Sequence, residues 1–149
     1  MTDEGEPSQR FGDLLQELVN RISHRGGETL TMMSEALVTL QQVLLLNRIA
    51  ERGGNSTSSE LAAALHMSLP SVSQMIDRLH QLGLVGRAEM SEDRRKRRIR
   101  LTPRGSELLA RIRMARSAEY EAGVIRLSPQ LRADLEAVLK RALDELAEE

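Results

Sequence analysis

Two short apolar runs separated by a basic segment constrain this chain more than any other feature. Leu84-Val85 and the pair Ile99 and Leu101 flank the run Asp93-Arg94-Arg95-Lys96-Arg97-Arg98. Apolar residues on both sides of a polar segment predict a β-hairpin, and the tip of this hairpin is expected to be basic. A helical segment ending at Gly83 comes directly before it. A helix followed by a basic hairpin predicts a winged helix-turn-helix.

The charge of the chain is concentrated around this hairpin. The 149 residues carry a formal net charge of -1. Between Leu69 and Arg104, nine basic and four acidic residues give a charge of +5, so the remainder carries -6. A basic patch on an acidic body is the electrostatic footprint of a DNA contact, and the alternative is a solvated charged face. The position of the run at a hairpin tip favours the DNA contact.

Cap signals predict the short helices before the hairpin. Thr39 with Gln42, and Thr57 with Glu60, have the spacing of capping boxes. The first of these helices is expected to stop at Gly53-Gly54, as helices do at C-terminal glycines. The two helices would form the first part of a helix-turn-helix.

The next helix is predicted to expose a polar face. Ser68 is a suitable N-cap, and Pro70 is tolerated in the first turn. The spacing of the apolar residues predicts one buried stripe, made of Val72, Met75, Ile76 and Leu79. The opposite face then presents Ser71, Gln74 and Arg78, with Ser68 at its tip.

The two ends of the chain predict amphipathic helices that the small centre cannot cover. Apolar residues repeat at helical spacing from Phe11 to Ile22, from Leu108 to Ile125 and from Leu131 to Leu146. Packing against a second copy would bury them, and the alternative is an intramolecular bundle. A two-fold dimer places two recognition helices about 34 Å apart, which suits a pseudo-palindromic DNA site. The interface residues we expect are Phe11, Leu14, Leu18, Ile125, Leu135 and Leu139.

The predicted fold is therefore mainly α with a small β-hairpin. Residues 39–104 are expected to form a winged helix-turn-helix lobe, and residues 1–38 and 105–149 the dimerisation helices.

Several classes of function are disfavoured. The chain has no cysteine, no glycine pattern with phosphate-loop spacing and no triad motif, so we expect no enzymatic activity and no cofactor. Its histidines (His24, His66 and His80) lack the spacing of metal ligands, so no metal site is expected. The acidic N-terminus and the absence of an apolar run of about 20 residues predict a cytoplasmic chain outside the membrane.

Several motifs occur in order between Thr39 and Gly105. They are the Thr39–Val43 helix start, Ser59-Glu60-Leu61-Ala62, Ser71–Leu79, Gly83-Leu84-Val85 with Arg87, Asp93-Arg94-Arg95, and Leu101-Thr102-Pro103-Arg104-Gly105. On these motifs the chain resembles the MarR family of transcriptional regulators, and the resemblance is strongest over Thr39–Gly105.

The resemblance implies roles for the matched residues. The helix from Ser68 to Leu82 corresponds to the recognition helix of the family. In it, Ser68 and Ser71 would bind phosphates or base edges, Gln74 would bind adenine, and Arg78 would bind guanine or a phosphate. In the wing, Asp93 would form a salt bridge with a nearby arginine, and Arg95 would enter the minor groove. The remaining wing residues expected to contact DNA are Arg94, Lys96 and Arg97.

Many members of the family bind small aromatic acids between the dimerisation helices and the DNA-binding lobe. This chain has one Phe, one Tyr and no Trp, so we expect an aliphatic, methionine-rich effector pocket. Its candidate lining residues are Met32, Met33, Leu37 and Met114, for which the alternative role is ordinary core packing.

Two hypotheses of function follow. The first is a homodimeric, sequence-specific DNA-binding regulator, a repressor released by a small-molecule effector. The second is a winged-helix module that contacts an acidic protein. The polar face with Gln74 and Arg78 favours the first, because it supplies groups that read bases as well as charge.

Overall fold

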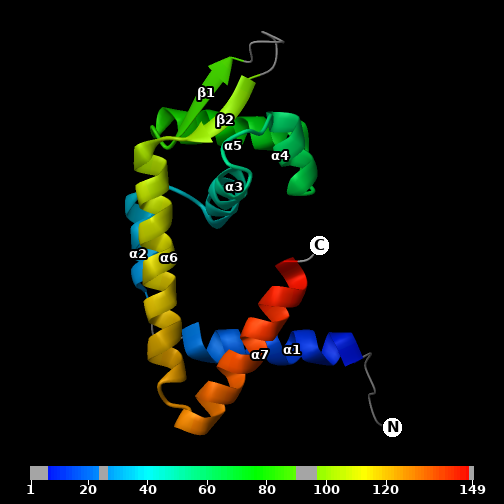
Figure 1. Cartoon of the computed structure of the whole chain (residues 1–149). Coiled ribbons are helices and arrows are strands. Elements are labelled where there is room, and N and C mark those ends of the chain that lie inside the picture. The colour runs from blue at the N-terminus through cyan, green and yellow to red at the C-terminus, as the bar shows by residue number, and fades with distance from the viewer. Residues whose placement is uncertain (1–6, 24–26, 90–96, 148–149) are drawn as a thin grey trace, which may run out of the picture. The chain divides into compact units, whose positions relative to one another are not determined.

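The computed structural model describes residues 7–23, 27–89 and 97–147. This part of the chain folds into seven helices and one two-stranded sheet, whose arrangement can be followed in Figure 1. Their bounds are α1 (Pro7–Ser23), α2 (Glu28–Glu35), α3 (Leu40–Glu51), α4 (Ser58–Ala64), α5 (Leu69–Gln81), β1 (Val85–Glu89), β2 (Arg97–Leu101), α6 (Pro103–Val124) and α7 (Pro129–Ala147).

The chain divides into two compact units. One is Gly27–Ala115, which holds α2 to β2 and the first half of α6. The other combines Met1–Gly26 with Arg116–Glu149 and holds α1, the end of α6, and α7. The two units are therefore described one after the other.

The larger unit is a winged helix-turn-helix. α4 packs on α5, and α3 packs on both α4 and β2. β1 and β2 pair antiparallel, with Val85 opposite Leu101 and Arg87 opposite Ile99. Ile99 N also donates a hydrogen bond of 2.8 Å to Ser56 O, which ties the hairpin to the loop after α3. The fold class predicted from the sequence is confirmed.

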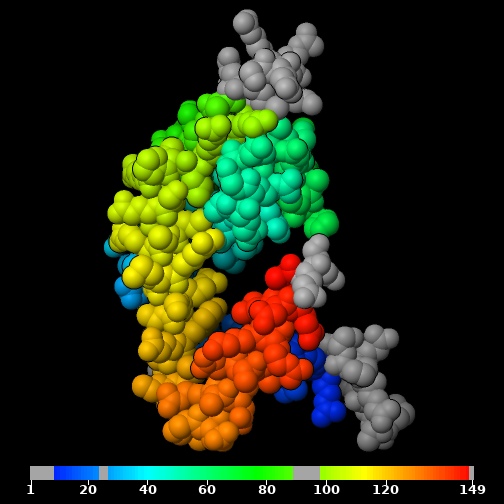
Figure 2. All heavy atoms as spheres, in the orientation of Figure 1, coloured from blue at the N-terminus to red at the C-terminus, as the bar shows by residue number. Residues whose placement is uncertain are grey.

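The core of this unit draws on every element from α3 to β2. Its most deeply buried apolar side chains are Leu45, Leu46, Ile49, Leu61, Val72, Ile76, Leu79, Val85 and Ile99. In Figure 2, the atoms of these elements, coloured cyan to yellow-green, form a continuous packed surface. Burial of these side chains is the main stabilising contribution to the unit.

The predicted caps are confirmed. Thr39 Oγ1 accepts a hydrogen bond from Gln42 N, and Gln42 Oε1 accepts one from Thr39 N at 3.0 Å. Thr57 and Glu60 make the same reciprocal pair at the start of α4. Ser68 Oγ accepts from the backbone N–H of Ser71 at the start of α5. Each cap satisfies backbone donors that a helix start leaves free.

A hydrogen-bonded junction joins the end of α5 to the start of α6. The backbone leaves α5 through Gly83, whose φ of 71° lies in the left-handed region that favours glycine. Thr102 Oγ1 donates to Gly83 O at 2.6 Å, and Thr102 N donates to Leu84 O at 3.1 Å. Thr102 Oγ1 also accepts from Gly105 N at 3.0 Å and thereby caps α6. The direction of α6 is thus coupled to the turn that ends the preceding helix.

The smaller unit has an apolar groove between its helices. The groove has a volume of about 750 Å³ and is lined by Phe11, Leu14, Leu15, Leu18 and Ile22 of α1 and by Leu135, Val138, Leu139 and Leu143 of α7, among others. No residue of α7 is buried.

α7 also carries an exposed ion pair. Lys140 donates a hydrogen bond of 2.6 Å to the Glu136 carboxylate, and this contact lowers the pKa of Glu136.

The structure places the six expected interface residues in this unit. Phe11, Leu14, Leu18, Leu135 and Leu139 line the groove. The sixth, Ile125, lies one residue beyond the end of α6 and is 64% exposed, outside the groove lining. Whether these residues meet a second copy is a prediction taken up below.

No single described helix is long and apolar enough to span a membrane. α2 and α3 reach the required length and composition only as a pair, and the chain bends by 88° between them.

Candidate nucleic-acid interface

The exposed face of α5 carries the polar side chains that the sequence predicted for it. Val72, Ile76 and Leu79 are completely buried on one side of the helix, which fixes its rotation about its own axis. Gln74 and Arg78 lie one turn apart on the other side, and both are exposed. Within the described part of the chain, neither side chain takes part in a hydrogen bond or ion pair. Two rigidly placed polar groups are therefore free to contact another molecule.

Two serines lie at the N-terminal end of the same face. Ser68 and Ser71 are exposed, and their hydroxyl oxygens are 2.7 Å apart. Ser68 also caps the helix. A hydroxyl at a helix N-terminus, next to free backbone N–H groups, is suited to bind a phosphate oxygen.

Two contacts attach the hairpin to this helix. Arg87 of β1 forms an ion pair with Asp77 of α5, which leaves 27% of the arginine side chain exposed. His80 Nδ1 lies 3.0 Å from Val85 O. Because a carbonyl can only accept, Nδ1 carries the proton in this bond. Neither contact was predictable from the sequence, since each needs the hairpin to fold back on the helix.

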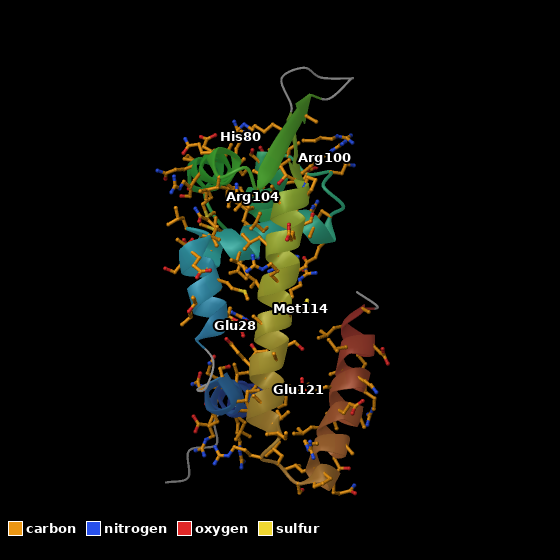
Figure 3. The ribbon with its side chains drawn as sticks, turned by 90° about the vertical axis from the view of Figure 1, so that its left-hand side faces the viewer. Glu28, His80, Arg100, Arg104, Met114 and Glu121 are labelled. Atoms are coloured by element: carbon orange, nitrogen blue, oxygen red, sulfur yellow. The ribbon has the colours of Figure 1, made fainter. Side chains whose placement is uncertain are left out.

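Further basic side chains lie on the hairpin and on α6. Arg98 is half-buried, and Arg100 and Arg104 are exposed. Figure 3 shows His80 on the α5 side of the hairpin and Arg100 on the opposite side. The backbone of Arg97 pairs with Glu89 in the ladder. The predicted wing residues Asp93, Arg94, Arg95 and Lys96 lie outside the described residues, as does the side chain of Arg97, so their roles stay predictions.

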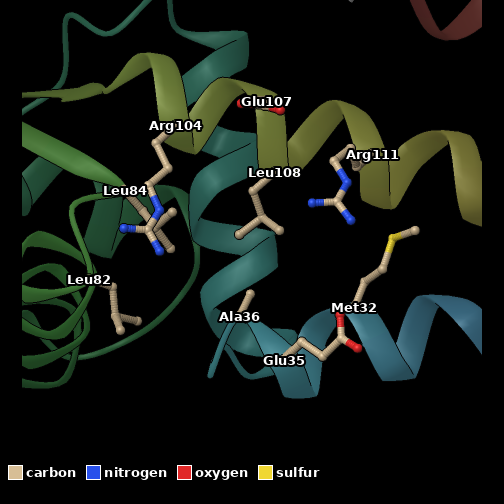
Figure 4. A pocket seen from close by; sticks show the side chains of 9 residues that line it. All are labelled: Met32, Glu35, Ala36, Leu82, Leu84, Arg104, Glu107, Leu108 and Arg111. Atoms are coloured by element: carbon tan, nitrogen blue, oxygen red, sulfur yellow. The ribbon is translucent and has the colours of Figure 1, made fainter.

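A cavity of about 270 Å³ lies between α2, the α5–β1 turn and α6 (Figure 4). Its apolar lining residues are Met32, Ala36, Leu82, Leu84 and Leu108, and its charged ones are Glu35, Arg104, Glu107 and Arg111.

The structure brings only one of the four predicted pocket residues to this cavity. Met32 lines it, whereas Met33 is buried in the core. Leu37 is 62% exposed and Met114 is 73% exposed, and neither lines the cavity. Figure 3 shows Met114 on the surface of α6. The cavity also differs in chemistry from the methionine-rich pocket expected, because four of its nine lining residues are charged.

Among the described residues, no group of three or more His, Asp or Glu side chains is arranged to hold a metal ion. His24 lies outside them.

The sequence of the winged helix is similar to a known protein family. A family model described as "MarR family" matches residues 38–96, a range that includes α3, α4, α5 and β1. This part of the chain is similar to the MarR family.

A curated protein is also similar to part of this chain. The chain is 34% identical over 97 residues to a putative transcriptional regulatory protein for the hcr operon of Thauera aromatica. The matched region spans 65% of this chain and 58% of that relative.

Solved structures share the MarR-type fold over nearly the whole chain. A transcriptional regulator from Thermotoga maritima has a TM-score of 0.74 and 21% identity, covering 94% of this chain and 96% of its own. A MarR family protein from Bacillus stearothermophilus has a TM-score of 0.73 and 19% identity, with 99% of each chain covered. The MepR–DNA complex of S. aureus has a TM-score of 0.64 and 20% identity, covering 93% of this chain and 96% of its own.

Proposed function

We propose that this chain is a sequence-specific DNA-binding transcriptional regulator and that α5 is its recognition helix. The observation that carries the proposal is the pair Gln74 and Arg78, which is exposed and has no partner among the described residues. The pair lies on a helix whose opposite side buries Val72, Ile76 and Leu79 completely. The similarity to MepR, which has been solved with DNA, and to a relative named as a transcriptional regulator supports it.

Each polar residue of α5 has a proposed role in the major groove. Gln74 would bind the N6 and N7 edge of adenine, and Arg78 would bind guanine or a phosphate. Ser68 and Ser71 would bind phosphates and fix the register of the helix. These contacts use side chains on one face, so they can form together.

The hairpin would act as the wing. We infer that Arg95 enters the minor groove, where a narrow A·T-rich segment concentrates negative potential. Asp93 would orient it through a salt bridge, and Arg94, Lys96 and Arg97 would contact the backbone. The Asp77–Arg87 pair would hold the base of this wing at a fixed position on α5.

The regulator would bind DNA as a homodimer in the cytoplasm. The groove between α1 and α7 leaves large apolar side chains exposed, which is typical of a surface that another protein covers. We assign dimerisation to residues 1–38 and 105–149 and DNA binding to residues 39–104. A two-fold dimer then requires a pseudo-palindromic operator.

We further propose that the protein is a repressor that a small molecule releases from DNA. Ligand binding would change the distance between the two recognition helices, so that they no longer match one turn of DNA. Such coupling commonly amounts to about 1–3 kcal/mol. Structures with and without the effector that show the same helix spacing would contradict this mechanism.

The proposed function can be tested by measuring, with fluorescence anisotropy, how tightly the protein binds the DNA that flanks the gene encoding it. We expect tight binding to one palindrome that weakens steeply with salt, because phosphate contacts release counterions. Arg78→Ala should weaken binding by about 1–3 kcal/mol and relax the preference at one base pair. Arg95→Ala should also weaken binding to that palindrome. Arg126→Ala removes the same charge from an exposed site in the smaller unit and should leave the affinity unchanged.

The opposite result is equally clear. If the wild type and both variants bind every DNA sequence with the same weak affinity, α5 does not read bases in the DNA that was tested. The operator would then lie elsewhere, or the winged helix would be a protein-interaction module with no specific DNA target.

A further inference from the structure

A side-chain contact joins α3 to the middle of α6, two helices that are labelled in Figure 1. Asn47 Oδ1 accepts two hydrogen bonds from the Arg113 guanidinium, from Nη2 at 2.9 Å and from Nε at 3.3 Å. Both residues belong to the larger unit. Because the N–H groups of a guanidinium form a rigid planar fork, two of them on one oxygen restrict its direction. The contact therefore fixes an angle as well as a distance.

The amide of Asn47 is also held from its other side. Its Nδ2 donates a hydrogen bond of 3.2 Å to Val43 O, one turn earlier in α3. A flipped amide would place its NH₂ against the guanidinium and its oxygen against the carbonyl, so both contacts would be lost. Asn47 is half-buried on a helix whose neighbouring residues Leu45, Leu46 and Ile49 are completely buried. It thus presents a rigidly placed acceptor to α6.

Two polar contacts, far apart along α6, hold this helix on the winged helix. At its start, Thr102 Oγ1 donates to Gly83 O at 2.6 Å. Arg113 follows 11 residues later, which is about 16 Å along the helix axis. The buried side chains between them, Leu108, Leu109 and Ile112, pack by the hydrophobic effect, which is not directional. Two fixed points determine the direction of an axis, so the direction of α6 depends on the second contact.

We propose that Asn47 and Arg113 are positioning residues that set the distance between the two α5 helices of the dimer. α6 continues for 11 residues beyond Arg113 and ends in the smaller unit, to which we assign dimerisation. Each rotation of about 10° at the contact would displace the far end of α6 by about 3 Å relative to the winged helix. In a two-fold dimer both protomers contribute, so the distance between the α5 helices would change by about 6 Å.

The inference deepens the proposed function and rests on its homodimer. Only dimers whose α5 helices match one turn of DNA would bind both half-sites. When the matching arrangement is a fraction of the population, the apparent affinity is reduced by that fraction. Loss of the Asn47–Arg113 contact would therefore weaken binding to the operator. It would leave the base preference unchanged, because no residue of α5 is altered.

Double electron–electron resonance on the full chain without DNA measures this distance directly. The chain has no cysteine, so Gln81→Cys, at an exposed position at the end of α5, provides one nitroxide label per protomer. We expect a single narrow distance distribution while Asn47 and Arg113 are intact. Asn47→Leu removes the acceptor and should broaden the distribution or shift its mean by about 3–6 Å. Leucine is a better helix former than asparagine, so this variant should be folded.

Three further variants test whether the contact itself is responsible. Arg113→Met should give the same distribution as Asn47→Leu, and the double variant should add no further change, because each removes the same interaction. Asn47→Asp keeps an acceptor for the guanidinium and should retain the narrow distribution. Arg116→Met is the matched control, since it removes the same charge from an exposed position on α6 and should change nothing.

Fluorescence anisotropy on the palindrome that wild type binds connects the distance to DNA binding. Asn47→Leu should bind this DNA about three- to tenfold more weakly, as the matching arrangement becomes a smaller fraction of the population. Asn47→Asp should bind like wild type, and both should keep the same preference at each base pair. Urea denaturation should show Asn47→Leu to be at least as stable as wild type, so unfolding would not explain its weaker binding.

Two results would overturn the inference and leave the regulator in place: an unchanged distribution in Asn47→Leu, or a distribution in Asn47→Asp as broad as that in Asn47→Leu. A wild type that gives no measurable distance would be a monomer, and the proposed homodimer would fail together with this inference. A wild type with the expected distances but no specific DNA binding would refute only the proposed function, because the distance measurement contains no DNA.

Discussion

At the scale of single residues, the contact between Gly105 and the α5–β1 turn leaves no space for a side chain. A Cβ at this position would lie 2.0 Å from Leu84 O and 2.9 Å from Leu84 C. That carbonyl is held in place because it accepts a hydrogen bond from Thr102 N. The backbones of α6 and the turn therefore approach each other as closely as only glycine permits.

We predict that Gly105→Ala destabilises the protein. Glycine to alanine in a helix normally stabilises by about 0.5–1 kcal/mol, but here the added methyl group must displace backbone. We expect the free energy of unfolding to fall by about 2–3 kcal/mol, the upper range for overpacking. Urea denaturation measures it. Gly86→Ala is the control, because nothing lies within 4 Å of a Cβ there, and its stability should be close to wild type. Equal stabilities of the two variants would show that the junction is not tight.

At the scale of elements, the helix starts depend on side chains three residues apart. Thr39 and Gln42 exchange hydrogen bonds at the start of α3, which supplies three completely buried residues to the core: Leu45, Leu46 and Ile49. Fraying of this start would loosen the helix on which α4 and β2 pack.

We predict that Thr39→Ala lowers the free energy of unfolding by about 1 kcal/mol, the usual value of an N-cap. Thr39→Asp should retain most of the stability, because aspartate is an equally good cap. Thr31→Ala changes an exposed threonine inside α2 and should have almost no effect. Thermal unfolding followed by circular dichroism compares the three. A Thr39→Asp variant as unstable as Thr39→Ala would mean that the side chain acts by packing and not as a cap.

Contacts between elements fix the surface proposed to read DNA. The Asp77–Arg87 ion pair and the His80–Val85 hydrogen bond both join α5 to β1. An exposed ion pair alone contributes little stability. The Asp77–Arg87 pair instead fixes an orientation. While this pair and the His80–Val85 hydrogen bond are both formed, the base of the hairpin cannot turn relative to α5.

At the scale of the whole molecule, the exposed apolar surface of the smaller unit is the surface that we propose a second copy covers. Phe11, Leu14 and Leu139 are each more than half exposed around one groove. Large apolar patches on a monomer mark interaction sites, and a second copy carries the same surface.

We predict that Leu139→Glu converts a dimer into a monomer. A charged side chain buried in an apolar interface lacks a partner and costs several kcal/mol. Sedimentation velocity at micromolar concentration should show wild type as a dimer and the variant as a monomer. Leu44→Glu places the same charge on an exposed leucine of α3 and should remain a dimer. A monomeric wild type would refute the assignment of residues 1–38 and 105–149 to dimerisation.

The sequence by itself determined the features that depend on residues close together in the chain. The caps at Thr39, Thr57 and Ser68 and the buried stripe of α5 need partners within three to seven positions, and the structure confirms them. The hairpin was predictable from its apolar flanks. In these cases, the hydrogen bond or helical period is set by local geometry, which the order of residues specifies directly.

Only the tertiary structure decided which distant residues meet. Glu35 and Arg111 come to one cavity from positions 76 residues apart, Gly105 meets Leu84, and Asp77 pairs with Arg87. Of the four methionine and leucine residues predicted to line an effector pocket, Met33 is buried in the core and Met114 is 73% exposed. Such contacts depend on the path of the whole chain and on which side chains are buried in the core. Neither can be predicted from a pattern of neighbouring residues.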